Sequence, residues 1–434
     1  MKKIICAYTL VLAYHACVFS DEEAPVLPDF IKVKSQNPVS VSSNPGTVDI
    51  LTGTGDLGKW IFQLKETDPL RFGAVWLADG DVTLTKNKLA SRFSGNNLLI
   101  LGMDFDTGKC SAWKGGLFGV EFLQFNGMNS NGRVGSVQGF DSMPANPPYA
   151  RTELYQAWYR QELFDKKLCL RIGKTLPSLD FNNVLRPIPV QRKSEAIPAV
   201  SGLLFTPVFT NPVNIGVMPG YYDSAYGVTA NIAPIDDFYV SLGAYDGNLA
   251  RGKNTGLEGP HFNGYYFYAA ETGVNWFAGR DHMPGIIALG GWYQTGLLSI
   301  PDVTKQNGAQ GVYLFGSQRV WFRSPGVDDS GISVFWQAGL NNGKTLPMNR
   351  FVGFGLTAFG LTRPSDSFGM GLAWSKLNKR LFERKSELML QTYYQAHLFL
   401  NTFIEPVLSY IPFPGGGKDL PQTCIFSVQV INLF

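Results

Sequence analysis

The sequence predicts an all-β protein: a transmembrane antiparallel β-barrel of about 16 strands, with a short N-terminal helical or linker segment. Three observations support this fold class. Only 16% of the 434 residues are charged, aromatic residues reach 13%, and there are 48 glycines. Beyond the first 20 residues, no uninterrupted apolar stretch is long enough for a membrane-spanning helix. Short segments of alternating apolar and polar residues follow one another instead, separated by Gly, Asn, Asp and Pro.

The N-terminus has the features of an export signal. Two lysines after the initiating methionine precede an uncharged run, 4–20, which three acidic residues follow. Because this run is too short to span a bilayer, we interpret residues 1–20 as a signal peptide cleaved after Ser20. Cleavage before Cys17, as in a lipoprotein, is less favoured because Tyr14 stands where a Leu is expected. Export and a barrel fold together predict the outer membrane as location.

The mature chain is nearly neutral. Removing two lysines with residues 1–20 lowers the basic count from 37 to 35, and the acidic count stays at 34, which leaves a net charge of +1. Such a balance gives no indication of a nucleic-acid partner.

The positions of the predicted linker, helix and strands suggest the domain organisation. We interpret residues 21–65 as a linker with a short periplasmic or lumenal helix, and residues 66–434 as the barrel. Apolar spacing predicts one helix around 60–77. If about 360 residues form the barrel and each strand takes about 20–25, roughly 14–18 strands result, and 16 is the even number in the middle. A barrel of this size leaves an aqueous channel.

The strand pattern is clearest at 166–173, at 387–400 and at the C-terminus. Each segment has one apolar and one polar face over about ten residues, which matches a tilted membrane strand better than a shorter sandwich strand. The last strand ends in Phe434. A final aromatic residue resembles the signal that the barrel-assembly machinery reads, so we expect this machinery and outer-membrane lipid as partners.

Strand parity predicts which side chains line the channel. A charge on the lipid face at mid-membrane would cost about 2–4 kcal/mol, so charged residues of these strands should point inward. Arg171 is expected to offer its planar fork of donors to solute hydroxyl groups. On the preceding strand, Tyr155, Ala157 and Tyr159 are expected to face out. The predicted pore-lining residues of the strands are Trp158, Arg160, Arg171, Lys174, Glu387 and Gln391.

Residues 181–220 contain six prolines and cannot form one membrane strand. A long loop of this kind is usually functional or disordered. We expect it to fold into or over the pore as a possible constriction. Its polar candidates for the pore lining are Asn183, Arg186, Arg192 and Glu195.

Motifs that would indicate an enzyme have simpler interpretations. Residues 53–58 spell GxGxxG, but the chain downstream lacks the strand–helix alternation of a dinucleotide-binding fold, so a turn before a short helix is favoured. The Gly-Lys-Thr strings at 173–175 and 343–345 lack the first glycine of a P-loop. Three mature histidines form no metal-ligand spacing, and no nucleophile elbow is present. No catalytic residue, metal or cofactor is therefore predicted.

Three cysteines remain after removal of the signal peptide: Cys110, Cys169 and Cys424. Their odd number and wide spacing argue against a disulfide framework, and we expect them to be buried or lipid-facing apolar residues. Whether any of them forms a disulfide is left open.

Six strings of residues, taken in order, resemble one family. They are Gly55–Gly58, Tyr155–Trp158, Arg171–Lys174 with Asp180–Asn182, Gly243–Asn248, Pro284–Gly285 with Gly290–Gly296, and Glu405–Pro406 with Pro414–Gly416. The chain from about residue 53 to 434 thereby resembles the carbohydrate-selective porins of the OprB type. It departs from their pattern in lacking a Trp in the first string and in reading Lys174-Thr175-Leu176 where the family usually has Lys-Leu-Asp.

The resemblance implies a 16-stranded barrel with a narrowed waist, through which small sugars pass by diffusion along arginines and aromatic rings. The alternatives are a general diffusion porin without sugar preference, a structural or adhesive surface barrel, and an outer-membrane enzyme. The sugar, and the choice between a monomer and a homo-oligomer, stay open.

Overall fold

The computed structural model describes residues 55–434, except 66, 85–92, 111–112, 142, 145–148, 183–210, 221–222, 236, 255–257, 326–329, 364–365, 400–401 and the side chain of 359. The expected signal peptide, 1–20, and the first part of the expected linker, 21–54, lie outside the described residues.

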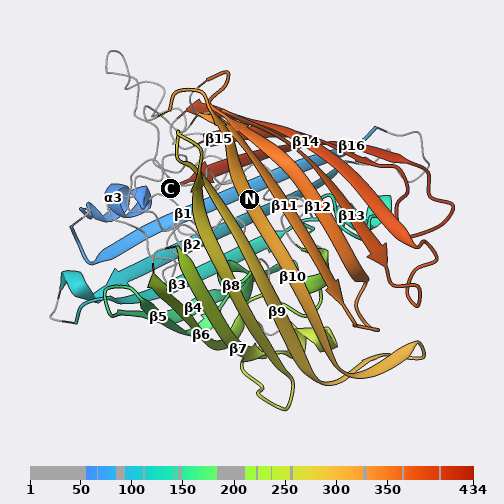
Figure 1. Cartoon of the computed structure of the whole chain (residues 1–434), viewed down its shortest axis with the longest axis horizontal. Helices are drawn as coiled ribbons and strands as arrows, with labels where there is room; N and C mark the ends of the chain where they lie inside the picture. Colours follow the sequence, from blue (N-terminus) through green and yellow to red (C-terminus); the bar gives the residue numbers. More distant parts are fainter. Residues whose placement is uncertain are drawn as a thin grey trace, which may run out of the picture.

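The described residues form sixteen antiparallel strands, each paired with its neighbours in the sequence, and β1 pairs with β16 to close the barrel (Figure 1). The predicted fold class is confirmed. The strands are β1 (Leu70–Thr83), β2 (Ser94–Asp106), β3 (Gly116–Asn126), β4 (Arg151–Leu163), β5 (Leu168–Thr175), β6 (Ala225–Ile235), β7 (Phe238–Asp246), β8 (Tyr266–Ala278), β9 (Met283–Ile300), β10 (Thr304–Phe322), β11 (Gly331–Asn341), β12 (Met348–Phe359), β13 (Ser367–Leu377), β14 (Ser386–Phe399), β15 (Thr402–Ile411) and β16 (Thr423–Leu433).

Helix α3 (Asp56–Phe62) lies where the first strand, β1, and the last strand, β16, meet. The amide of Gly55 donates to the carbonyl of Phe434 (3.2 Å), and Ala74 and Phe434 exchange backbone hydrogen bonds. Gly55 has φ of +81°, a conformation that favours glycine and explains the turn before the helix. The helix expected at 60–77 is wrong in extent, because α3 ends at Phe62 and the apolar residues from Leu70 onward belong to β1.

The connections at the two ends of the barrel differ in length. At the end that holds Phe434 they are short, as at 164–167 and 279–282, which is typical of the periplasmic end of such barrels. At the opposite end two long connections turn back into the barrel. Connection 127–150 contains α4 (Ser130–Val134), and connection 176–224 contains α5 (Pro177–Asp180) and the 3₁₀ turn η3 (Pro212–Asn214).

The outer face of the wall is apolar. Leu170, Leu289 and Phe354 are typical of its middle band and are exposed in the isolated chain. Near the end that holds Phe434, the rings of Phe118 and Tyr159 lie 4.7 Å apart and belong to an outward aromatic cluster. This distribution matches a lipid-facing band bordered by an aromatic girdle.

In the described part of the chain, no helix is both long enough and apolar enough to cross a membrane.

Candidate functional site

The inner wall of the barrel is built from the alternate residues of every strand, and it is unusually rich in aromatic rings. Each of several inward rings lies over a glycine directly opposite it on the neighbouring strand. A Cβ placed on that glycine would come within 2.1–2.5 Å of the ring. The pairs are Trp158 with Gly119, Tyr239 with Gly273, Tyr245 with Gly227, Trp292 with Gly311, Tyr313 with Gly290, Phe335 with Gly355, and Tyr393 with Gly369.

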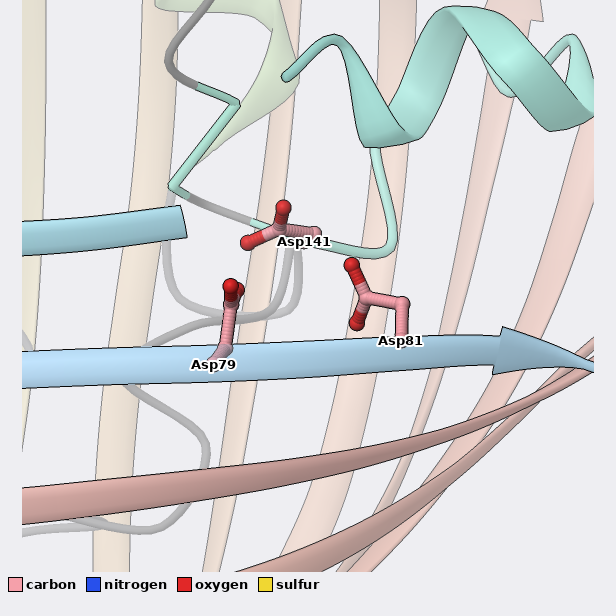
Figure 2. Close-up of side chains that lie close together, drawn as sticks. All are labelled: Asp79, Asp81 and Asp141. Atoms are coloured by element: carbon pink, nitrogen blue, oxygen red, sulfur yellow. The ribbon is translucent and has the colours of Figure 1, made fainter. Parts of the chain in front are cut away.

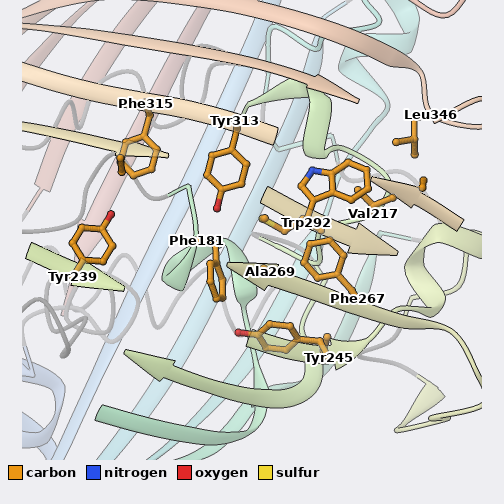
Figure 3. Packing of buried hydrophobic residues seen from close by; sticks show 14 of the residues in the cluster. Phe181, Val217, Tyr239, Tyr245, Phe267, Ala269, Trp292, Tyr313, Phe315 and Leu346 are labelled. Atoms are coloured by element: carbon orange, nitrogen blue, oxygen red, sulfur yellow. The ribbon is translucent and has the colours of Figure 1, made fainter. Parts of the chain in front are cut away.

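This pairing gives these seven of the 48 glycines a structural role, because a ring can lie flat against the wall only where its neighbour has no side chain. Figure 3 shows the densest part, where Tyr245, Phe267, Trp292 and Tyr313 gather along β7 to β10 around Phe181 of connection 176–224. These rings are 0–4% exposed, because residues of connection 176–224 pack against them.

A cluster of basic residues with acidic partners lies on β4 and β5. Arg171 donates to the carboxylate of Asp180 in α5, and its guanidinium carbon lies 5.7 Å from the centre of the Trp158 ring. The Nε of Arg171 has no hydrogen-bond acceptor in the described structure. Thr229 on β6 also donates to Asp180 (3.0 Å). One side of the Arg171 fork is therefore occupied, which sequence parity did not predict.

The remaining basic residues of the cluster are paired as well. Lys174 lies 3.8 Å from Glu153, and Arg151 donates to the other oxygen of Glu153 at 2.8 Å. Arg160 lies 3.5 Å from Glu162, and these two side chains are more exposed than the rest, at 13% each. The charges on this side of the wall therefore compensate one another locally.

Asp223, in connection 176–224, lies next to this cluster, 4.0 Å from Arg151. Burial raises the pKa of Asp223 to about 6; Arg151 lowers this pKa and Glu153 raises it, and both effects are smaller than that of burial. This carboxyl group therefore titrates in the range where most carboxylates stay ionised.

Connection 127–150 is fixed to the far wall by Glu387 on β14. One carboxylate oxygen accepts hydrogen bonds from the Ser136 hydroxyl and the Gln138 amide, both at 2.9 Å. The other accepts from the amides of Val137 (3.0 Å) and Gly415 (2.6 Å). Gln391, four residues further along β14, donates to the carbonyl of Phe140 at 3.0 Å. Both residues face inward, but their polar atoms hold the connection.

The described ends of connection 176–224 are also held inside the barrel. The amide of Asn182 donates to Glu271 on β8 (2.6 Å), which also accepts from the hydroxyls of Tyr239 (2.7 Å) and Tyr313 (2.8 Å). At the other end, the indole of Trp292 donates to the Asn214 side chain at 2.9 Å. The described parts of the two connections thus contact different sectors of the inner wall.

The structure places the expected strand residues Trp158, Arg160, Arg171, Lys174, Glu387 and Gln391 on the inner wall. The first four lie together on β4 and β5, and the last two lie apart from them on β14. Asn183, Arg186, Arg192 and Glu195 lie outside the described residues.

The expected outward placement of Tyr155 is wrong. The pairing of β3 with β4 is irregular between Glu121 and Phe122, so that Tyr155 and Gln156 are both buried inside. A β-bulge of this kind shifts the parity of every residue before it. Sequence analysis also missed the inward carboxylates Glu121, Glu153, Glu271 and Glu405, which only strand-by-strand parity could have indicated.

None of the three cysteines forms a disulfide with another described cysteine. The described part of the GxGxxG string, 55–58, forms the turn into α3 and its first residues, and the following strand, β1, pairs antiparallel with β2 and β16. This arrangement differs from the parallel sheet of a dinucleotide-binding fold.

The chain forms a closed sixteen-stranded barrel with an apolar outer band, a polar and aromatic inner wall and inward connections. These features define a channel of the porin class, in the outer membrane. The model of the carbohydrate-selective porin, OprB family, matches residues 94–431, and the chain belongs to this family. The resemblance inferred from the sequence strings is thereby confirmed.

Comparison with known proteins agrees with this assignment. The chain is 23% identical to Porin B of Pseudomonas aeruginosa over 379 aligned residues. This alignment covers 77% of this chain and 80% of that protein. It is similar in fold to the high-pH structure of Pseudomonas putida OprB, with a TM-score of 0.72, 20% identity, and coverage of 88% of this chain and 99% of that one. The low-pH structure of the same protein gives a TM-score of 0.55 at 16% identity, covering 88% and 97%.

Proposed function

We propose that this chain is an outer-membrane channel for the passive diffusion of small sugars, and that its selectivity arises where Trp158 and Arg171 meet on the inner wall. Their juxtaposition is the observation that carries the proposal. A ring that lies flat over Gly119 can hold the apolar face of a sugar, and the adjacent guanidinium offers donors to its hydroxyl oxygens.

Weak binding of this kind suits a channel. Sugar hydroxyls both donate and accept, so facing charged groups and amides can replace water along the path, yet binding must be weak enough for the solute to leave. The paired charges at Arg160–Glu162 and Lys174–Glu153 supply both donors and acceptors. We assign solute contact to Trp158, Arg160, Arg171 and Lys174, and to the loop residues Asn183, Arg186, Arg192 and Glu195. We assign loop anchoring to Glu387 and Gln391.

Planar-bilayer recording with a panel of sugars tests the proposal. The purified channel should carry an ohmic current that sugars block, and Trp158→Ala should weaken the block. Trp321→Ala is the matched control, because Trp321 is an exposed side chain on the outer face of β10. A current indifferent to sugars would favour a general diffusion porin, and the absence of current would favour a structural or adhesive surface barrel.

We further propose that residues 1–20 direct export, and that the terminal Phe434 is read by the barrel-assembly machinery. Phe434 directly follows β16, and the centre of its ring lies 6.3 Å from the centre of the Trp60 ring in an edge-on contact. Mass spectrometry should find Asp21 as the mature N-terminus, whereas a lipidated Cys17 or a retained Met1 would contradict the signal peptide. Deletion of Phe434 should reduce the amount of heat-modifiable barrel in the membrane, and an unchanged amount would contradict its role in assembly.

A further inference from the structure

Three aspartates from distant parts of the sequence meet inside the barrel. Asp79 and Asp81 are inward residues of β1, and Asp141 belongs to connection 127–150, which lies above them (Figure 2). One oxygen from each carboxylate lies within 4.8 Å of the other two. The three residues are 8%, 3% and 5% exposed, so that little solvent reaches them.

The surrounding donors hold the carboxylates in place. The backbone amide of Asn96 donates to Asp79 (2.8 Å), and its side-chain amide donates to Asp141 (3.0 Å). The hydroxyls of Ser427 (2.6 Å) and Ser94 (3.2 Å) donate to the two oxygens of Asp81. The amide of Met143 (2.6 Å) and the hydroxyl of Ser130 also donate to Asp141.

Two buried oxygens at this place have no amide, hydroxyl or cationic donor in the described structure. The Oδ2 atom of Asp79 is one of them, and its only side-chain hydrogen-bonding neighbour among the described residues is the carboxyl group of Asp141, toward which Figure 2 shows the Asp79 carboxylate directed. On β16, Gln429 lies directly opposite Asp79, is 4% exposed, and its Oε1 atom also accepts no hydrogen bond. None of the three aspartates forms an ion pair with a described residue.

Three carboxylates this close in a buried place cannot all stay ionised unless a cation lies among them; without a cation, at least one of them keeps its proton. We propose that Asp79, Asp81 and Asp141 bind a Ca²⁺ ion. The ligands are all hard oxygens, which Ca²⁺ and Mg²⁺ prefer over other cations. Because two oxygens on opposite sides of Ca²⁺ are about 4.6–5.2 Å apart, the carboxylates already have nearly the spacing that coordination requires.

Ca²⁺ fits better than Mg²⁺ for two reasons. Mg²⁺ retains several of its waters and demands octahedral geometry, whereas Ca²⁺ accepts six to eight oxygens in irregular arrangements. The free amide oxygen of Gln429 beside Asp79 suits such an irregular shell. The expectation of a chain without metal sites was based on local motifs, which cannot detect ligands at positions 79, 81 and 141.

The ion would attach connection 127–150 to β1, which only β16 and β15 separate from β14, the strand that carries its other anchor, Glu387. The connection is then held at two places, by Asp141 through Ca²⁺ and by Ser136, Val137 and Gln138 through Glu387. Removal of Ca²⁺ should therefore loosen one side of the connection and lower the stability of the barrel, independently of any sugar.

Calorimetric titration and thermal melting of the full-length protein, purified in detergent and stripped with EDTA, test the site. We expect uptake of one Ca²⁺ per chain and a higher melting temperature with Ca²⁺ than with EDTA. The variant Asp79→Asn/Asp81→Asn should lose both effects. Glu121→Gln, which alters a buried inward carboxylate on β3, should retain both.

Two results would overturn the proposal: a wild-type protein that takes up no Ca²⁺, or an Asp79→Asn/Asp81→Asn variant that still takes it up. A melting temperature that rises on acidification but not with Ca²⁺ would show that protons neutralise the cluster instead. If the double variant does not assemble, Asp141→Asn serves in its place, and the wild-type titration remains decisive.

Discussion

Arg171 and Asp180 form a buried ion pair inside the barrel. The guanidinium belongs to β5 and the carboxylate to the end of α5, and their side chains are 3% and 2% exposed. The pair joins the wall to connection 176–224 at the point where the Trp158 ring lies beside the guanidinium. Arg171 therefore has two roles, as a neighbour of the proposed sugar path and as the anchor of a connection.

The first prediction concerns this anchor. Arg171→Ala should lower the free energy of unfolding by about 3–5 kcal/mol, because it leaves the Asp180 carboxylate buried without a partner. Adding Asp180→Asn should restore much of the loss. Urea unfolding of the barrel, followed by tryptophan fluorescence, measures both changes.

Lys305→Ala is the control for the Arg171 series, because it removes an exposed cation at the start of β10. If Arg171→Ala unfolds at the same urea concentration as this control, the ion pair does not hold the connection.

The second prediction concerns the ring over Gly119. Gly119→Ala places a Cβ 2.3 Å from the Trp158 ring, so the ring must move. We expect a loss of about 1–3 kcal/mol in stability and a weaker sugar block of the current. In Gly291→Ala the nearest atom lies 3.5 Å from the new Cβ, so this variant should behave like wild type. Equal sugar block in both variants would remove Trp158 from the path.

The third prediction concerns Glu387. Glu387→Gln replaces one charged acceptor by an amide that donates, so at least one hydrogen bond to a charged group is lost, at about 1.5–3 kcal/mol. Connection 127–150 should become more mobile, which increased proteolysis and noisier single-channel current would show. Glu383→Gln, at a side chain that is 69% exposed, is the matched control. Quiet current in Glu387→Gln would mean that other contacts suffice.

The fourth prediction concerns pH. The pKa of Asp223 is raised from 3.8 to about 6 by burial, so the folded protein binds this proton more tightly than the unfolded chain does. The stability that this proton contributes is complete below about pH 4 and is lost as the pH rises through 6. Asp223→Asn, which resembles the neutral form, should therefore raise the melting temperature at pH 7.5 and change it little at pH 4.

Melting curves of wild type and Asp223→Asn at the two pH values measure this effect, with Asp419→Asn, an exposed loop position, as the control. The prediction is contradicted if the two proteins differ by the same amount at both pH values.

Alternation in the sequence predicts the faces of β5, of β16 and of 386–397 in β14 because the pairing is regular there; the pairing of β14 with β15 becomes irregular only between His397 and Phe399. The prediction for Tyr155 fails because β4 has an extra residue where it pairs with β3, and alternation cannot reveal an insertion. The helix expected at 60–77 fails for a related reason, since a short helix and the start of a strand together gave one continuous apolar pattern.

The contacts of the inward connections could not be predicted. Ser136 and Glu387 are 251 residues apart in the sequence, and nothing local to either position indicates the other. The same holds for Asp141, which meets Asp79 only because the barrel closes and the connection folds back. Sequence parity therefore gave the direction of Arg171, Glu387 and Gln391, and the partners of all three required the three-dimensional structure.

The rings laid over glycines mean that the bore of the channel is set by pairs of positions. Each pair projects only the thickness of one ring, and the glycine beneath it contributes nothing but peptide backbone. Truncating such a ring would therefore widen the channel and also expose a strip of backbone amide and carbonyl groups. Selection for a larger solute at one of these places would also change the polarity of the surface that the solute meets.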